Sequence, residues 1–161
     1  MTMTGPEGIA DRAAKPIPIV DEASRPFFEG AAAGKLMLLR CAVCEAWIAP
    51  TPTVATQRRP ACVRCFSGKV DWERASGRGV LYSFAIVHQP YHPAFAEEIP
   101  YNISTVQLAE GVRLTAAVID CASDDLQVGM PLVATFEQLS DEVAIPKFRP
   151  SQPAHQEAHQ D

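Results

Sequence analysis

Two Cys-x-x-Cys motifs, Cys41/Cys44 and Cys62/Cys65, constrain this chain more than any other feature, and seventeen residues separate them. Each motif can form a tight turn that directs two sulfur atoms to one point. The residues between the motifs suffice for a short hairpin that returns the second turn to the first. Four thiolates then surround a zinc ion tetrahedrally and leave no open coordination position. The spacing therefore predicts one structural zinc ion, not a catalytic one.

Two disulfides or a redox-active pair are the alternative uses of these cysteines. Disulfides are typical of secreted proteins, whereas the first thirty residues show no charged start followed by an apolar run. A redox Cys-x-x-Cys belongs at the strand-to-helix junction of a βαβ unit, but Pro50, Pro52 and Pro60 disfavour a long helix here. Structural zinc is the favoured interpretation, and we expect a cytoplasmic protein.

The chain's 161 residues allow one core, or a core with a small satellite module. No apolar run approaches the ~20 residues that span a membrane. Residues 35–78 carry eight basic and three acidic side chains, a net charge of +5, whereas residues 79–150 carry three basic and nine acidic ones, a net charge of −6. A basic segment beside an acidic one suits an anionic ligand or an acidic partner surface at the basic segment.

The expected fold is mainly β and is organised in five segments. Residues 1–20 form a flexible arm rich in Gly and Pro. Residues 21–34 form a short helix that begins at Asp21 or Ser24 and ends at Gly34. Residues 35–76 form a zinc ribbon with strands at 35–40, 45–48 and 70–73, and Trp47 is expected to cover the metal.

The fourth segment, residues 77–150, is strand-rich. Strands are expected at 80–88, 101–108, 112–119, 132–139 and 143–148, with a proline-rich loop at 89–100. Five strands without a strong helix between them predict an OB-fold barrel. Residues 151–161 are polar and are expected to be a disordered tail.

In their order, these features resemble the acyl-CoA-associated family of small proteins that join a rubredoxin-like zinc ribbon to an OB-fold. The resemblance runs from about Pro26 to Pro150, and it rests on Pro26-Phe27-Phe28, Gly34-Lys35-Leu36, the two cysteine motifs, Trp72, Ser76-Gly77-Arg78-Gly79-Val80-Leu81-Tyr82-Ser83-Phe84, Pro100-Tyr101, Val106-Gln107-Leu108-Ala109-Glu110-Gly111 and Val128-Gly129-Met130-Pro131. One position departs from it. Such knuckles usually carry Gly after the second cysteine, and here Glu45 stands there, so the local geometry is expected to differ.

The resemblance implies an accessory role. Relatives look like non-catalytic partners of thiolase-superfamily enzymes (steroid side-chain aldolases, acetyl transferases) or of MaoC-like enoyl-CoA hydratases, and they help to enclose the CoA-thioester channel. It implies a hetero-oligomer with acyl-CoA at a shared site, and it transfers no catalytic residue.

The residues themselves offer no nucleophile–base pair. Cys121 is the cysteine left outside the zinc set, and it is expected to be a half-buried thiol. The expected contacts to CoA phosphates or to an acidic partner are Arg64 and the adjacent arginines Arg58 and Arg59. Aromatic side chains are the other expected contacts because they anchor interfaces: Phe27, Phe28, Tyr91, Phe95 and Tyr101.

A function of another class is binding of single-stranded nucleic acid, which OB-folds and zinc ribbons both perform. The net charge of −6 on residues 79–150, the expected barrel, argues against this function, since a groove that follows phosphates should be basic. We therefore expect no nucleic-acid partner.

Overall fold

A computed structural model describes residues 15–50 and 61–151 of the chain. Most of the predicted arm, Arg58, Arg59 and residues 152–161 of the predicted tail lie outside these residues. In the part described, none of the helices is both long and apolar enough to cross a membrane.

The helix α1, Arg25–Ala32, is shorter than expected because residues 21–24 form its capping turn. The Asp21 carboxylate accepts hydrogen bonds from the backbone N–H of Ser24 at 2.8 Å and from its hydroxyl at 2.6 Å. These two bonds lower the pKa of Asp21. The chain leaves the helix at Gly34, whose φ of 69° is a backbone conformation that glycine adopts without strain.

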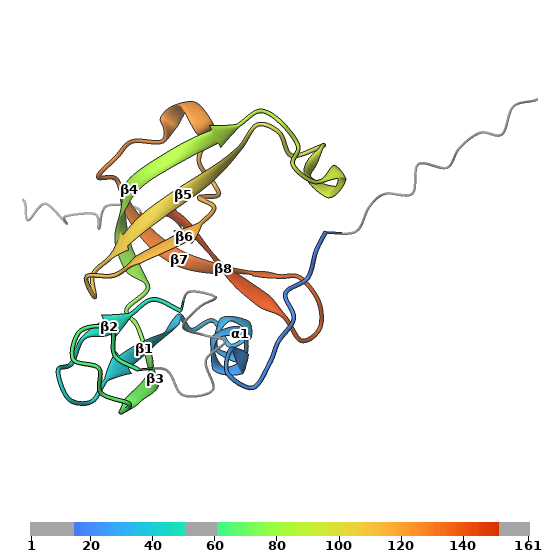
Figure 1. Ribbon diagram of the computed structural model, residues 1–161. Coiled ribbons are helices and arrows are strands. Elements are labelled where there is room, and N and C mark those ends of the chain that lie inside the picture. Colours follow the sequence, from blue (N-terminus) through green and yellow to red (C-terminus); the bar gives the residue numbers. More distant parts are fainter. Residues whose placement is uncertain (1–14, 51–60, 152–161) are drawn as a thin grey trace, which may run out of the picture.

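Three short strands form the ribbon beside α1: β1 (Met37–Cys41), β2 (Trp47–Ile48) and β3 (Val70–Arg74). They are antiparallel in the order β2-β1-β3. In Figure 1 this small sheet and α1 lie together below the larger sheet.

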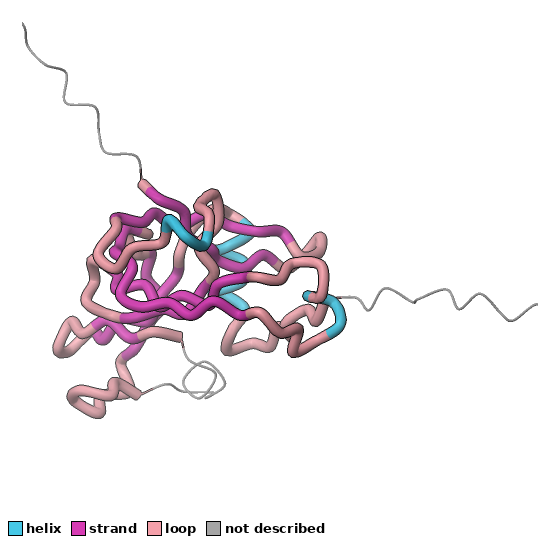
Figure 2. Tube along the Cα trace, turned by 90° about the horizontal axis from the view of Figure 1, so that it is seen from above, coloured by secondary structure: helices cyan, strands magenta, loops and turns pink. Residues whose placement is uncertain are grey.

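The larger sheet contains β4 (Arg78–Val87), β5 (Tyr101–Leu108), β6 (Arg113–Ala116), β7 (Pro131–Gln138) and β8 (Ala144–Pro150). Its order is β6-β5-β4-β7-β8, and short 3₁₀ turns lie at Pro93–Phe95 and Ser123–Asp125. The sheet curls on itself, as Figures 1 and 2 show, and a bridge between Val118 and Phe148 joins the segment after β6 to β8. The predicted class, a mainly β chain with a five-stranded OB-like barrel, is confirmed.

The strands β4, β7 and β8 begin and end within two residues of the expected bounds, and two further features of the sheet were not expected. The strand expected at 112–119 ends at Ala116 because the following residues turn away from β5 toward β8. The register of β4 against β5 shifts between Leu81 and Ser83, so Tyr82 is the additional residue of a bulge. A bulge re-aims a side chain, and Tyr82 is exposed with the Arg113 guanidinium 3.5 Å from its ring centroid.

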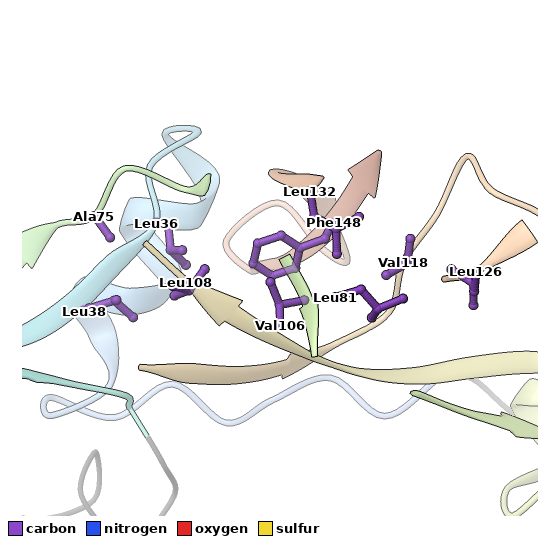
Figure 3. Close-up of a cluster of buried hydrophobic side chains, with 10 residues drawn as sticks. All are labelled: Leu36, Leu38, Ala75, Leu81, Val106, Leu108, Val118, Leu126, Leu132 and Phe148. Atoms are coloured by element: carbon purple, nitrogen blue, oxygen red, sulfur yellow. The ribbon is translucent and has the colours of Figure 1, made fainter. Parts of the chain in front are cut away.

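One buried cluster joins the ribbon to the barrel, as the side chains in Figure 3 show. Leu36, Leu38 and Ala75 from the ribbon side pack with barrel residues such as Leu108 and Phe148. The two modules therefore share a core, and the ribbon is not a separate satellite.

Polar contacts fix the same junction. The Ala75 N–H donates to the Leu36 carbonyl at 2.8 Å, and the Ala134 N–H donates to the Gly77 carbonyl at 2.7 Å. The Glu110 carboxylate accepts the Ser76 N–H at 2.5 Å. The turn between β5 and β6 is thus tied to the segment that links the modules.

The opposite side of β1 carries a second cluster of Leu39, Cys41, Ile48 and Cys62. Trp72 packs against this cluster, whereas Trp47 packs against the main core, so the expectation that Trp47 covers the metal site is wrong. The reason is strand alternation, because Trp47 and Ile48 are consecutive and point to opposite faces.

Candidate metal centre and adjoining cleft

The two cysteine motifs fold into knuckles with the same hydrogen bonds. The carbonyl of the first cysteine accepts an N–H four residues on: Cys41 from Glu45 at 2.9 Å, and Cys62 from Phe66 at 2.8 Å. The sulfur of the first cysteine accepts an N–H two residues on, at 3.4 Å in both knuckles. Sequences that share only the cysteines therefore build two equivalent turns.

Each knuckle closes with a residue in the left-handed region. Glu45 has a φ of 58°, and Phe66 at the matching position has a φ of 59°. Our expectation that Glu45 changes the local geometry is wrong, because the turn keeps the same bonds as the second knuckle. The backbone adopts a conformation that disfavours side chains with a Cβ atom.

The four sulfur atoms lie within 4.8 Å of one another. Cys41 Sγ is 3.6 Å from Cys65 Sγ, and Cys44 Sγ is 3.5 Å from Cys62 Sγ. A tetrahedral ion with bonds of ~2.3 Å to sulfur requires separations of roughly 3.8 Å, whereas a disulfide requires about 2.05 Å. The cluster has the geometry to hold one metal ion, and these cysteines are not paired in disulfides.

Backbone N–H donors lower the pKa of two of the thiols, those of the first cysteine in each motif. The N–H groups of Cys44 and Val43 lower the pKa of Cys41, and that of Cys65, with a further contribution from Arg64, lowers the pKa of Cys62 to about 6. The Ser67 N–H lowers the pKa of Cys65, but the neighbouring thiols and burial outweigh it and raise this pKa to about 12. Four thiolates this close repel one another, and a bound cation removes that repulsion.

A cleft of about 700 Å³ opens beside β5 and β6. Its apolar walls include Phe95, Tyr101, Leu114 and Ile145, and it lies between the loop after β4 and the strands β7 and β8. This is the side of an OB-fold on which ligands bind, near strands 2 and 3 and the loops that flank them.

Two ion pairs stand at the cleft. Lys15 pairs with Glu98, which raises the pKa of the lysine, and its ammonium lies 5.6 Å from the Phe95 ring centroid. Lys147 Nζ lies 2.7 Å from a carboxylate oxygen of Glu137. Both lysines at the cleft are therefore neutralised by carboxylates.

The far wall of the cleft is held by Asn102. Its amide donates to the Val118 carbonyl at 2.7 Å and accepts the Val118 N–H at 2.8 Å. The Ser104 hydroxyl donates to the same amide oxygen at 2.9 Å. Sequence reasoning missed Asn102, Lys147 and Glu137, because these residues carry no motif and only the register of the strands brings them to the cleft.

The structure brings three of the expected contact residues together. Phe27, Phe95 and Tyr101 line the cleft, and the rings of Phe95 and Tyr101 lie 6.0 Å apart. Phe27 also packs against the main core, as an anchor of α1.

The other expected contacts are dispersed. Phe28 lines a separate hollow beside Val20 and Arg25. Tyr91 is 82% exposed on its loop, and Arg64 is exposed on the second knuckle. Cys121 is half-buried at the cleft, and burial raises the pKa of its thiol.

Comparisons with known proteins agree with this architecture. The model of the family described as "ChsH2, C-terminal OB-fold domain" matches residues 72–137. A solved structure titled "Ltp2-ChsH2(DUF35) aldolase" has a TM-score of 0.67 and 33% sequence identity, over 83% of this chain and 98% of the other.

Two curated relatives are longer than the matched part. A probable enoyl-CoA hydratase alpha subunit from Thermomonospora curvata is 35% identical over 144 residues, which cover 88% of this chain and 42% of that protein. A DUF35 domain-containing scaffold protein from Methanocaldococcus jannaschii is 32% identical over 92 residues, which cover 56% of this chain and 64% of that protein. The chain thus spans less than half of the first relative and just under two thirds of the second.

Proposed function

Because this chain belongs to the DUF35 family of OB-fold proteins, we propose that it is a non-catalytic accessory subunit of an acyl-CoA-processing complex. The observation that carries the proposal is the similarity over almost the whole of a chain from the Ltp2-ChsH2(DUF35) aldolase. The name of the hydratase alpha subunit supports the same class of substrate.

The proposed partner is a thiolase-superfamily enzyme of the aldolase or acyltransferase type, in a hetero-oligomer. A MaoC-like enoyl-CoA hydratase is the second candidate, and the hydratase alpha subunit favours it. The partner supplies the catalytic residues, since the described cleft pairs its lysines with carboxylates and places Cys121 among apolar groups that disfavour its thiolate.

The proposed metal is one structural zinc ion held by Cys41, Cys44, Cys62 and Cys65. Zinc suits four sulfur ligands in a tetrahedron. When bound, it neutralises thiolate charge and fixes the two knuckles to each other. The ribbon (35–76) and the barrel (77–150) then act as one rigid body through their shared core.

The proposed role of the cleft is to receive the uncharged part of a CoA thioester. Its walls are apolar and aromatic, and its lysines are already paired. This charge pattern does not suit the alternative ligand, a single-stranded nucleic acid, which requires cations free to follow the phosphates.

Co-expression with thiolase-like and MaoC-like proteins of the same host tests the proposal. We expect one of them to form a stoichiometric complex by native mass spectrometry, and we expect turnover of an acyl-CoA that the purified subunit alone lacks. Failure to assemble with either class, together with salt-dependent binding to a single-stranded oligonucleotide, would overturn it.

A further inference from the structure

A second cavity, on the outer face of the barrel, contains two arginines in one cross-strand row. Arg78 on β4 is opposite Val133 on β7, and Val133 is opposite Arg149 on β8. Residues directly opposite one another point to the same face, and two strand spacings separate the arginine Cα atoms by about 10 Å. Both side chains therefore project from a rigid sheet toward the same space.

Neither arginine forms an ion pair with a carboxylate of the described residues. Within residues 15–50 and 61–151, the ion pairs engage Lys15, Arg40 and Lys147, and no carboxylate pairs with Arg78 or Arg149. Both are exposed, and they line a cavity of about 730 Å³. Among the described barrel residues, Arg113 also lacks a carboxylate partner, but its guanidinium stacks on the Tyr82 ring and donates to the Gln107 side chain. Arg78 and Arg149 have no such side-chain contact within the described part of the chain.

One carboxylate opposes an anion in this cavity. Asp120, which has a φ of 56°, lines the same space, so the charged side chains leave it with a net charge of +1. The negative charge of Asp120 weakens the binding of an anion in this cavity. A variant without this charge should therefore bind the anion more tightly.

The arginine cavity and the apolar cleft share a wall. Ile119 and Cys121 line the cleft, whereas Asp120 between them lines the arginine cavity. Along β8, Lys147 lines the cleft and Arg149 lines the cavity. The Ile119 N–H donates to the Phe148 carbonyl at 2.8 Å, which fixes the shared wall to β8.

We infer that Arg78 and Arg149 bind the phosphate groups of CoA while the adjoining cleft receives the uncharged portion of the thioester. Guanidinium groups bind phosphate oxygens through paired, charge-assisted hydrogen bonds. A row of two arginines can engage the diphosphate and the 3′-phosphate together. This inference rests on the proposed function, and it adds two barrel arginines to the phosphate contacts expected at Arg58, Arg59 and Arg64.

The test is a calorimetric titration of the full-length protein with CoA, 3′-dephospho-CoA and pantetheine at low salt. We expect CoA to bind more tightly than the other two. Arg78→Ala and Arg149→Ala should each weaken CoA binding about tenfold, and Asp120→Asn should tighten it several-fold. Arg74→Ala is the matched control: it removes one unpaired positive charge from the ribbon, and CoA binding should stay within twofold.

Thermal unfolding of each variant verifies that it is folded. Equal binding of CoA and pantetheine, no CoA binding at millimolar concentration, or an equal loss in the Arg74→Ala variant would overturn the inference. Competition by a twelve-nucleotide single strand at the affinity of CoA would also overturn it, in favour of a general polyanion surface. If the complex with a catalytic partner assembles while these outcomes occur, the inference fails and the proposed function stands.

Discussion

At the scale of single residues, the knuckles retain strain that a glycine would relieve. Glu45 and Phe66 both have a φ near 58°, where a side chain is costly. We expect Glu45→Gly to raise the free energy of unfolding of the metal-loaded protein by roughly 0.5–1 kcal/mol, after the entropy lost by glycine is subtracted. Chemical denaturation measures this. Ala42→Gly, in the same knuckle but without a positive φ, should instead lower stability by about 0.5–1 kcal/mol.

The cysteines supply a second prediction at this scale. Cys62→Ser should remove the bound metal and lower the free energy of unfolding by at least about 3 kcal/mol, because metal-binding energy at such a site is folding energy. Metal analysis and thermal unfolding measure the two effects. Cys121→Ser is the control, and it should retain a full equivalent of metal; loss of metal from this variant as well would contradict the assignment.

The difference in predictability between these residues is physical. The four ligands could be predicted because a metal knuckle is local in sequence, and its spacing is set by the turn itself. The left-handed conformation of Glu45 could not, because the sequence offers a residue that disfavours it. The contacts between the two knuckles, Cys41 Sγ with Cys65 Sγ and Cys44 Sγ with Cys62 Sγ, override that local preference.

At the scale of elements, β1 separates the two buried clusters and joins the modules. Leu38 faces the main core and Leu39 faces the cysteines, and both are fully buried. We expect Leu38→Ala to lower the free energy of unfolding by about 2–5 kcal/mol. The ribbon and the barrel should still unfold together, in a single transition at a lower denaturant concentration. Denaturation followed by tryptophan fluorescence, which reports the ribbon, and by far-ultraviolet circular dichroism, which is dominated by the barrel, measures this.

Val80→Ala is the control for that experiment. Val80 is 40% exposed on β4, so its truncation should cost well under half as much. Two separate transitions in the Leu38→Ala variant would mean that the modules fold independently, contrary to the shared core.

The strands could be predicted better than their arrangement. Alternation and turn residues placed β5 at its observed bounds, 101–108. The early end of β6, the bulge at Tyr82 and the row of Arg78, Val133 and Arg149 depend on register between distant segments. No local pattern encodes that register, so the cleft and the arginine cavity could not be derived from the sequence.

At the scale of the whole molecule, the cleft and the arginine cavity are neighbouring surfaces that suit different parts of a ligand. The cleft is apolar with paired lysines, and the outer cavity has unpaired arginines. The predicted basic ribbon and acidic barrel described net charge along the chain, and that division counted Arg78 with the ribbon. The fold instead places Arg78 on β4, where it lines one cavity together with Arg149 of β8. The net charge of each segment therefore does not decide which surface suits an anion. The positions of the ion pairs decide it, because they determine which cations remain unpaired.

The cleft makes a prediction about the assembled complex. Thr115 lines it from β6 and is exposed, so Thr115→Trp adds bulk without entering the core. If the cleft receives the acyl portion, kcat/KM of the complex should fall about tenfold for a long acyl-CoA, since steric exclusion of that chain costs roughly 1.4 kcal/mol. The kcat/KM for acetyl-CoA should change little.

Val128→Trp is the control. It lies at a 67% exposed position that does not line the cleft, and it should leave both kcat/KM values unchanged. An equal loss for both substrates, with assembly intact by native mass spectrometry, would place the acyl chain elsewhere, because only a steric obstacle in its path distinguishes long chains from short ones.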